Sequence, residues 1–257
     1  MDIREILRLS QDELYKYVCS FMNECQIPFE HSPNRKWIFA RGSAPVLLVA
    51  HLDTVHQNPP RRILCDEERT LLWSPEGIGG DDRCGVYAML VILADMPSKF
   101  RPSVLFTTDE ERGGLGVQDF MQTYPVPPMD LRYIIELDRA GDNDCVFYNC
   151  CNPEFEKYVQ KYWFKEAYGS FTDISFLAPQ WGIAAVNLSC GYYNPHTLSE
   201  YIDMGDLYYT VARVESMIDD SPNVALFKYI PLTPEDKILY PHWSVNDLYD
   251  MEGDDEE

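Results

Sequence analysis

The sequence predicts an α/β fold, a three-layer sandwich in which helices cover both faces of a central sheet that is mostly parallel or mixed. Short continuous apolar runs, the pattern of strands buried on both faces, occur at 45–50, 104–107, 131–137 and 183–188. Segments with apolar residues at helical spacing lie between them. Because strand-like and helix-like segments alternate, a parallel or mixed sheet packed between helices is the expected architecture.

The first half of the chain shows this alternation clearly. Ser10 and Glu13 form a capping box, and apolar residues at 14–22 recur at helical spacing, which predicts a helix starting after Ser10. A buried strand is expected at 45–50, and a helix with a largely apolar sequence at 81–96.

The second half continues the same pattern. We expect strands at 104–107, 131–137 and 183–188, and helices at 154–167 and 206–218. No internal repeat and no linker rich in Gly, Ser or Pro divides these elements.

One domain is therefore expected over residues 1–240, followed by an acidic, partly disordered tail at 241–257. The last twelve residues, NDLYDMEGDDEE, contain seven acidic side chains. Such a run is typical of a solvated tail that keeps a protein soluble, and an interaction tail is the alternative.

Composition excludes several functional classes. The chain has 42 acidic and 21 basic residues and a formal net charge of −21, which argues against nucleic-acid or anionic-membrane partners because phosphate contacts need clustered Lys and Arg. The longest apolar stretch, 86–94, is about half of the ~20 residues that a spanning helix needs. The mixed-charge N-terminus is unlike a signal peptide, and the eight cysteines include no CxxC pair. We therefore expect reduced thiols and a cytoplasmic location.

Acidic residues and histidines gather where the predicted strands end. Three predicted strands are followed by segments that contain such residues, at 51–53, 108–111 and 136–138. Two further segments of this kind lie before a predicted helix, at 79–82, and after a predicted strand, at 194–197. Ligands of open α/β sheets bind beyond the carboxyl ends of the strands, so these side chains are expected to converge on one crevice.

Each of these residues has an ordinary structural explanation when it is considered alone. His51 fits a buried structural histidine, Asp81 fits a helix N-terminus, and Glu110 with Glu111 fits a solvated loop. Four carboxylates and two histidines at one edge of a sheet, however, would repel each other severely without a cation. The combined pattern therefore predicts a metal site.

The ordered motifs resemble those of the co-catalytic zinc exopeptidases, the superfamily that includes peptidase T, carboxypeptidase G and the bacterial leucyl aminopeptidases. Five motifs that span most of the chain carry the resemblance, and together they are more specific than any one of them: HLDTV (51–55), GIGGDDRCG (77–85), DEERGGLG (109–116), ELD (136–138) and NPHTLSEYID (194–203).

The resemblance implies two zinc ions. His51 and Asp138 would hold one ion, Glu111 and His196 the other, and Asp81 would bridge both. Two divalent ions about 3.5–4 Å apart need a shared carboxylate to screen their repulsion, and each ion would have three protein ligands. The nitrogen and oxygen ligands suit Zn2+, and Co2+ or Mn2+ can substitute. In relatives the peptide bond after the bridging Asp is cis, so a cis bond between Asp81 and Asp82 is predicted.

The resemblance also implies a mechanism of amide hydrolysis. Glu110 would act as general base, taking a proton from a dizinc-bound water so that the hydroxide attacks the amide carbonyl, and then protonating the leaving nitrogen. Asp53 lies two residues beyond His51 along a strand and projects to the same side, where its carboxylate would orient the imidazole.

The favoured activity is that of an aminopeptidase on small peptides. Asp138 and His196 are 58 positions apart, too short a separation for the lid domain that many relatives insert there, so the chain resembles the single-domain aminopeptidases. The alternatives are a dipeptidase, a carboxypeptidase or a deacylase of N-acyl amino acids on the same site. A remote alternative is an acidic interaction protein without activity, against which the presence of Glu110 and all five ligands argues.

Three further residues are weaker candidates for substrate binding. Arg139 follows a predicted ligand, and a salt bridge is an equally good explanation for it. Asp173 lies where relatives place a Ser/Thr-Asp segment beside the site. Tyr192, with Tyr193, Trp181 and Phe171, either shapes a specificity pocket or belongs to the core. The sequence leaves the oligomeric state open.

Overall fold

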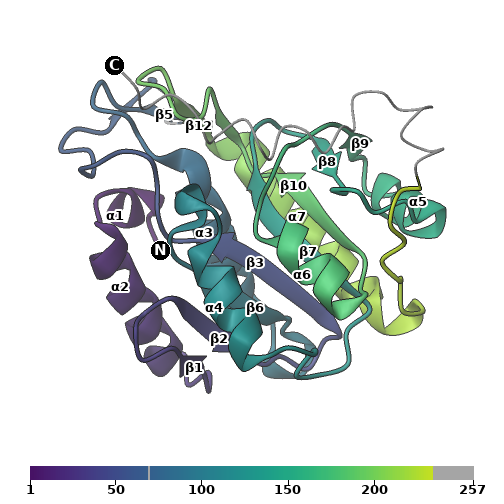
Figure 1. The fold of residues 1–257 in the computed structure, drawn as a ribbon. Coiled ribbons are helices and arrows are strands. Elements are labelled where there is room, and N and C mark those ends of the chain that lie inside the picture. The colour runs from purple at the N-terminus through teal and green to yellow at the C-terminus, as the bar shows by residue number, and fades with distance from the viewer. Residues whose placement is uncertain (69, 234–257) are drawn as a thin grey trace, which may run out of the picture.

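The structure is a computed structural model that describes residues 1–68 and 70–233. The tail predicted at 241–257, and the domain boundary predicted at residue 240, lie outside the described residues. An eight-stranded mixed sheet forms the centre of the molecule (Figure 1). Its strand order is β1 (Glu30–His31), β2 (Trp37–Ala40), β6 (Ser103–Thr107), β3 (Val46–His51), β7 (Tyr133–Arg139), β10 (Ala185–Ser189), β8 (Asp144–Val146) and β9 (Lys165–Glu166).

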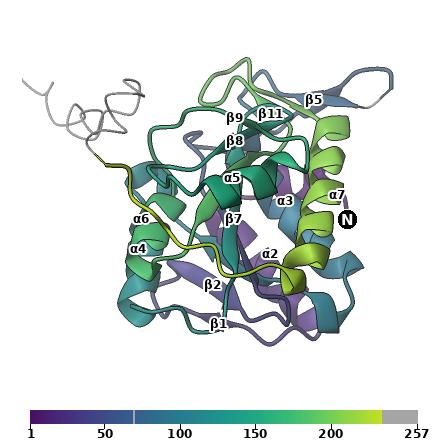
Figure 2. The same ribbon diagram turned by 90° about the vertical axis from the view of Figure 1, so that its right-hand side faces the viewer.

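The four central strands β6, β3, β7 and β10 run parallel, whereas β1, β2 and β8 join the sheet by antiparallel pairing. Helices cover both faces of this sheet, as Figures 1 and 2 show. One face carries α1 (Ile3–Leu7), α2 (Gln11–Glu24), α3 (Gly80–Asp95), α5 (Pro153–Gln160) and α7 (Met204–Asp220). The other carries α4 (Leu115–Thr123) and α6 (Ile174–Trp181). The predicted three-layer α/β architecture is confirmed.

Strand β3 shows why its sequence is a continuous apolar run. Leu48 and Ala50 belong to the core on the α3 side, whereas Leu47 and Val49 belong to the core on the α4 and α6 side. All six residues of β3 are buried, because neither face of the strand reaches water. The carboxyl ends of the parallel strands then meet at one edge of the sheet.

Most predicted elements are present within a few residues of their expected bounds. The capping box of α2 is formed, since Glu13 Oε2 accepts the backbone N–H of Ser10 and Ser10 Oγ accepts that of Glu13. The helix predicted at 154–167 is too long, because α5 ends at Gln160. Trp163 adopts a left-handed conformation with φ 68°, which stops the helix and lets the chain continue into the edge strand β9.

A second, antiparallel sheet has the strand order β11 (Tyr192–Tyr193), β12 (Tyr201–Asp203), β5 (Leu71–Trp73) and β4 (Leu64–Cys65), and short 3-10 helices occur at η1 (Ser98–Phe100), η2 (Glu110–Arg112) and η3 (Ser221–Asn223). The sequence did not predict this sheet, whose strands are only two or three residues long. Residues 140–195 form β8, β9, β10, β11, α5 and α6, so no lid domain interrupts them.

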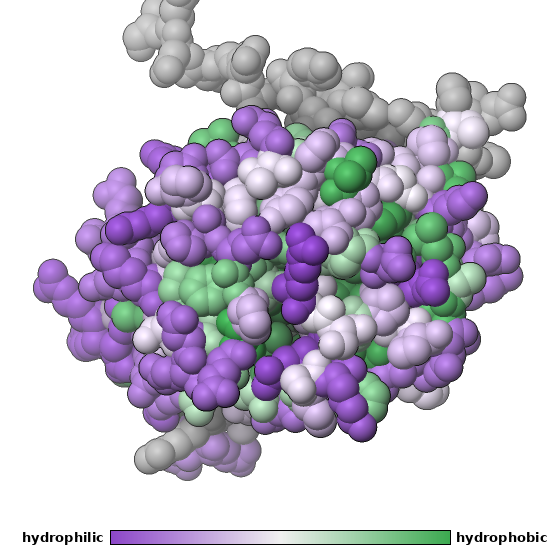
Figure 3. All heavy atoms as spheres, turned by 90° about the horizontal axis from the view of Figure 1, so that it is seen from below, coloured by the Kyte–Doolittle hydropathy of each residue, from purple (hydrophilic) through white to green (hydrophobic). Residues whose placement is uncertain are grey.

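Polar residues cover most of the face that Figure 3 shows, with smaller hydrophobic patches between them. No helix in the described part of the chain combines the length and the apolar character needed to cross a membrane.

Candidate metal centre

Neighbouring parallel strands deliver the predicted side chains to one edge of the sheet. His51 is the last residue of β3, and Asp138 lies near the end of β7. The two strands pair in parallel with Val49 opposite Glu136, so His51 and Asp138 each lie two residues beyond this pair and are level with one another. Asp81 comes from the first turn of α3, where the peptide bond to Asp82 is cis, as predicted.

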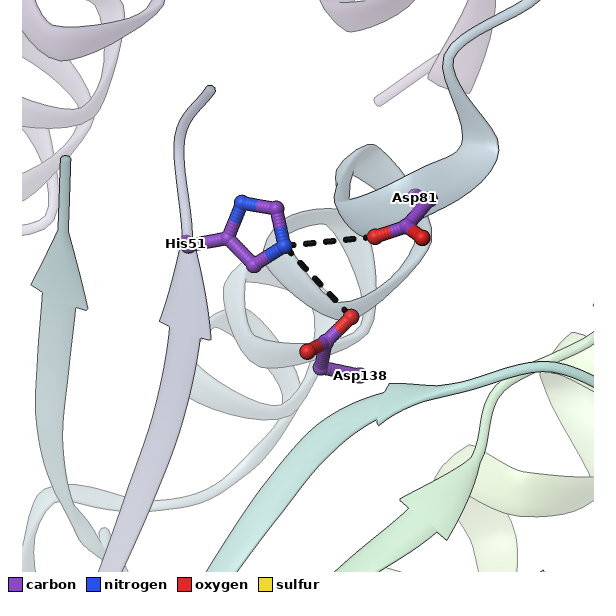
Figure 4. A group of neighbouring side chains, drawn as sticks. All are labelled: His51, Asp81 and Asp138. Carbon is purple, nitrogen blue, oxygen red and sulfur yellow. Dashed lines mark hydrogen bonds and ion pairs between the residues drawn. The ribbon is translucent and has the colours of Figure 1, made fainter. Parts of the chain in front are cut away.

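His51, Asp81 and Asp138 converge on one point (Figure 4). His51 Nε2 lies 3.2 Å from Asp81 Oδ1 and 3.5 Å from Asp138 Oδ1. The His51 side chain is buried, so its ring nitrogen meets carboxylate oxygens rather than water. Asp138 is held in turn by two hydroxyl groups, since Tyr192 donates to its Oδ1 at 3.2 Å and Thr172 to its Oδ2 at 3.0 Å.

A second group forms on the other side of Asp81. His196 Nε2 lies 3.2 Å from Asp81 Oδ2 and 3.1 Å from Glu111 Oε1. Glu111 belongs to η2, which follows β6, and His196 lies between β11 and β12. His196 adopts φ 62°, an unusual conformation for a residue other than glycine and one that occurs at functional sites. Asp81 therefore turns one oxygen toward each imidazole.

In both groups the potential ligand atoms lie within 4.8 Å of one another. The five residues are those that the sequence analysis named as ligands, and they divide between the two groups in the same way. A third, overlapping group joins His51 to Glu110 and Glu111. The structure thus brings the predicted residues together, while their role as ligands remains a proposal.

The electrostatics of this cluster suit cations. Burial raises the pKa of Glu110 to about 9 and the pKa of Glu111 to about 7. The pKa of Asp138 is raised to about 6, mainly by burial and also by repulsion from Asp81. A hydrogen bond to Asp81 raises the pKa of His196 to about 9. Burial opposes ionisation of Asp81 as well, but hydrogen bonds from His196 and His51 lower its pKa below the ordinary value.

The donor set provides a test of whether a metal fits. Four carboxylates surround the ring nitrogens of His51 and His196. The two rings have too few N–H groups to donate a hydrogen bond to all of these carboxylate oxygens. Each group supplies three nitrogen or oxygen ligands, the number that catalytic zinc sites take from the protein. The residues present therefore fit a pair of divalent cations that share Asp81.

Asp53 connects this cluster to the loop that carries the predicted general base. Its Oδ1 lies 3.3 Å from His51 Nδ1, close to the ring that it is predicted to orient. The same carboxylate accepts two backbone N–H groups, that of Glu110 through Oδ1 and that of Glu111 through Oδ2, each at 3.1 Å. The sequence analysis did not anticipate this second role. Glu110 is buried, and its Oε2 lies 3.9 Å from His51 Nε2.

Two buried carboxylates that hold the site in shape were missed by sequence reasoning. Glu200 accepts the backbone N–H of Asp81 through Oε1 and that of Gly79 through Oε2, both at 2.9 Å. Asp82 accepts the backbone N–H of His51 at 3.1 Å. Glu200 belongs to the motif at 194–203, but no local pattern indicates that it contacts a loop about 120 residues earlier.

A cavity of about 680 Å³ opens beside the cluster, and Asp81, Glu110, Glu111, Asp138 and His196 lie in its wall. Its apolar walls include Tyr148, Phe171, Phe176, Tyr192 and Pro195. This is the size and character of a small-molecule or peptide site.

Two of the weaker candidates for substrate binding, Arg139 and Tyr192, line this cavity. Asp173 does not: its side chain is fully buried and accepts a hydrogen bond from Thr107 Oγ1. Trp181 packs in the core and Tyr193 stacks on Tyr201, so neither belongs to the described lining.

The family model described as Peptidase family M28 matches residues 37–179. Solved structures with a similar fold include a tripeptidase from Staphylococcus aureus, with TM-score 0.68 and 12% identity over 86% of this chain and 97% of that one. The aminopeptidase PepT from Bacillus cereus has TM-score 0.66 and 13% identity over 86% and 97%. An aminopeptidase from the archaeon Desulfurococcus kamchatkensis has TM-score 0.66 and 15% identity over 86% and 94%. A search of curated proteins finds no match.

Proposed function

The chain belongs to peptidase family M28, and on that premise we propose that it is a dizinc aminopeptidase that acts on small peptides. Family membership identifies the protein as a metallopeptidase; the metal count, the direction of attack and the substrate are the proposal. The observation that carries it is the position of Asp81, whose two carboxylate oxygens each lie 3.2 Å from a different imidazole, His51 and His196.

The ligands proposed for the two ions follow this division. His51, Asp81 and Asp138 would hold one ion, and Asp81, Glu111 and His196 the other. Bound divalent cations supply Lewis-acid chemistry, which polarises a substrate carbonyl and makes a water molecule more acidic. The donor atoms suit Zn2+, with Co2+ or Mn2+ as substitutes.

Glu110 is the proposed general base and acid. Its carboxylate lies in the cavity wall, and it does not belong to either group of ligands centred on Asp81. In this position Glu110 would take a proton from the attacking water and deliver it to the leaving nitrogen. Asp53 would keep Glu110 in place through the backbone of the loop, and the buried surroundings would keep bulk water from the proton.

The surplus of carboxylates favours a substrate with a free α-ammonium group. Four carboxylates line the cavity, and Glu110 is not committed to either ion in the proposed assignment. A positively charged amino terminus can pair with this uncommitted carboxylate, whereas a blocked one cannot. Similar folds that are named tripeptidase and aminopeptidase support the same choice. A dipeptidase, a carboxypeptidase or a deacylase of N-acyl amino acids on the same residues is the alternative.

The test uses chelator-treated protein reloaded with Zn2+. We expect hydrolysis of Leu-Gly-Gly and not of N-acetyl-Leu-Gly-Gly, with release of the N-terminal residue detected by mass spectrometry. Glu110→Gln is the matched variant, and it should lower kcat about 10²- to 10⁴-fold while the bound zinc is retained. Cleavage of the blocked peptide alone would replace the aminopeptidase assignment by the deacylase or carboxypeptidase, and no hydrolysis by the loaded protein would refute the proposal.

A further inference from the structure

We propose that Arg139 forms a subsite for a carboxylate on the leaving part of the substrate, which makes di- and tripeptides with a free carboxylate the preferred substrates. This inference rests on the proposed function, because it names the substrate class of the same cavity. It adds a recognition element at the end of the peptide opposite the α-ammonium group.

The end of β7 places Arg139 unusually. Successive residues of a regular strand point to opposite faces of the sheet, yet Asp138 and Arg139 both line the same cavity. The pairing with β10 explains this. Glu136 pairs with Asn187, and Arg139 pairs with Ser189, so the register of the two strands shifts between these pairs. Strand β7 has one extra residue over this interval, and such irregularities redirect side chains beside active sites.

The guanidinium group of Arg139 retains donors for a ligand. Its Nε is buried without a hydrogen-bond partner, and its side chain is 29% exposed. Its ion pair is with Asp144, and the distance of 3.5 Å between Arg139 Nη2 and Asp144 Oδ2 is too long for a strong hydrogen bond. An arginine has five N–H donors in a planar fork that matches a carboxylate. This pairing leaves room for a second, better-aligned carboxylate.

The charges of the cavity indicate what Arg139 recognises. Of the described residues in its lining, Arg139 alone carries a permanent positive charge, whereas four carboxylates surround the proposed metal positions. With two divalent cations balancing those four carboxylates, Arg139 is the charged side chain left in this described lining to attract a carboxylate of the substrate. The aromatic side chains of Tyr148 and Phe171 lie in the same lining and suit the apolar parts of a peptide.

Arg139 directly follows Asp138, a proposed ligand, and both residues line the same cavity. A carboxylate on the leaving part of a short peptide, near the scissile bond, is therefore the one that Arg139 is placed to meet.

The test compares matched peptides that differ only in one carboxylate. Leu-Gly-Gly and its C-terminal amide probe the main-chain carboxylate, and Leu-Asp-amide and Leu-Asn-amide probe an acidic side chain. With the zinc-loaded wild-type protein, we expect the carboxylate member of one pair to have a kcat/KM about 10- to 100-fold higher, which also identifies the source of the carboxylate. Arg139→Gln should abolish this preference, so that kcat/KM becomes equal within the pair. Arg112→Ala, which removes an exposed arginine that does not line the cavity, should keep it.

Binding provides an independent readout. Calorimetry with Glu110→Gln should show tighter binding of Leu-Gly-Gly than of its amide, or of Leu-Asp-amide than of Leu-Asn-amide, and the added substitution Arg139→Gln should remove the difference. Equal binding and equal rates within both pairs, or a preference that survives in Arg139→Gln and Arg139→Ala, would overturn the inference. Failure of the loaded protein to hydrolyse any of the four peptides refutes the proposed function instead, and the calorimetric comparison still decides on Arg139.

Discussion

The carboxylate of Asp53 accepts the backbone N–H of Glu110 at 3.1 Å. Asp53 follows strand β3 and Glu110 follows strand β6, so a residue beyond one strand holds the proposed base beyond the next strand of the sheet. The same side chain lies 3.3 Å from the imidazole of His51. Asp53 is buried, and its contacts with His51 and with the two backbone N–H groups lower its pKa despite the opposing effect of burial. A single ionised carboxylate thus connects a proposed ligand to the proposed base.

Substitution of Asp53 by Asn tests this connection. An amide nitrogen facing a backbone N–H or the imidazole disturbs the loop, so we expect kcat for Leu-Gly-Gly and the affinity for zinc each to fall about 10- to 100-fold. Asp109→Asn is the control, since Asp109 lies in the same loop but pairs with Lys36. A normal kcat and a normal zinc affinity in Asp53→Asn would contradict the role assigned to it.

The shared position of Asp81 predicts different metal contents for two variants. Asp81→Asn weakens a ligand to both ions, so we expect the purified protein to retain less than one zinc per chain. His196→Ala removes a ligand to one ion and should retain about one, against about two in the wild type. Inductively coupled plasma mass spectrometry measures the ratio. Two tightly bound ions in Asp81→Asn would show that Asp81 does not bridge.

Glu200 is expected to act through the loop that carries Asp81. In Glu200→Gln an amide nitrogen replaces one of the oxygens that accept N–H groups from Gly79 and Asp81, leaving a buried donor unpaired at a cost of about 1–3 kcal/mol. We expect Tm to fall by a few degrees and zinc to bind more weakly. Glu76→Gln, on the exposed side of the same region, should change neither quantity. An unchanged zinc affinity in Glu200→Gln would limit Glu200 to a purely structural role.

Stability of the metal-free protein should fall as the pH rises. Burial raises the pKa of Glu111 from 4.5 to about 7 and that of Glu110 to about 9, so the folded state binds protons that the unfolded state has lost. His196, with a pKa raised to about 9, acts in the same direction from about pH 6.5 upward. The free energy of unfolding therefore decreases between about pH 5 and 9.

Urea denaturation of chelated protein across this range measures that dependence. Bound zinc should flatten or reverse the slope, because the ligands bind the metal in their deprotonated forms. The variant Glu111→Gln should have a shallower slope than the wild type when metal-free. A metal-free protein that is more stable at pH 9 than at pH 6 would contradict the arrangement of charges described above.

Several parts of the fold were readable from local patterns. The buried run in β3 and the capping box of α2 are properties of adjacent residues, and both were predicted correctly. Helices α4 and α6 were not predicted, because one follows Gly113 and Gly114 and the other contains Pro179, residues that usually interrupt a helix. Packing against the sheet stabilises both helices despite these residues.

The chemical identity of the candidate site was contained in the order of its motifs. Histidine and carboxylate residues at the carboxyl ends of buried strands lie at one edge of the sheet when those strands run parallel, so the presence of His51, Asp138 and Glu111 at one edge was predictable from the chain alone. Folding decided how these groups are held and what surrounds them. The hydrogen bond that the backbone N–H of Asp81 donates to Glu200 depends on the path of the backbone, and the turn of Arg139 into the cavity depends on the register between β7 and β10. Such contacts join residues far apart in the chain, and no local pattern of side chains determines that two distant segments will be neighbours.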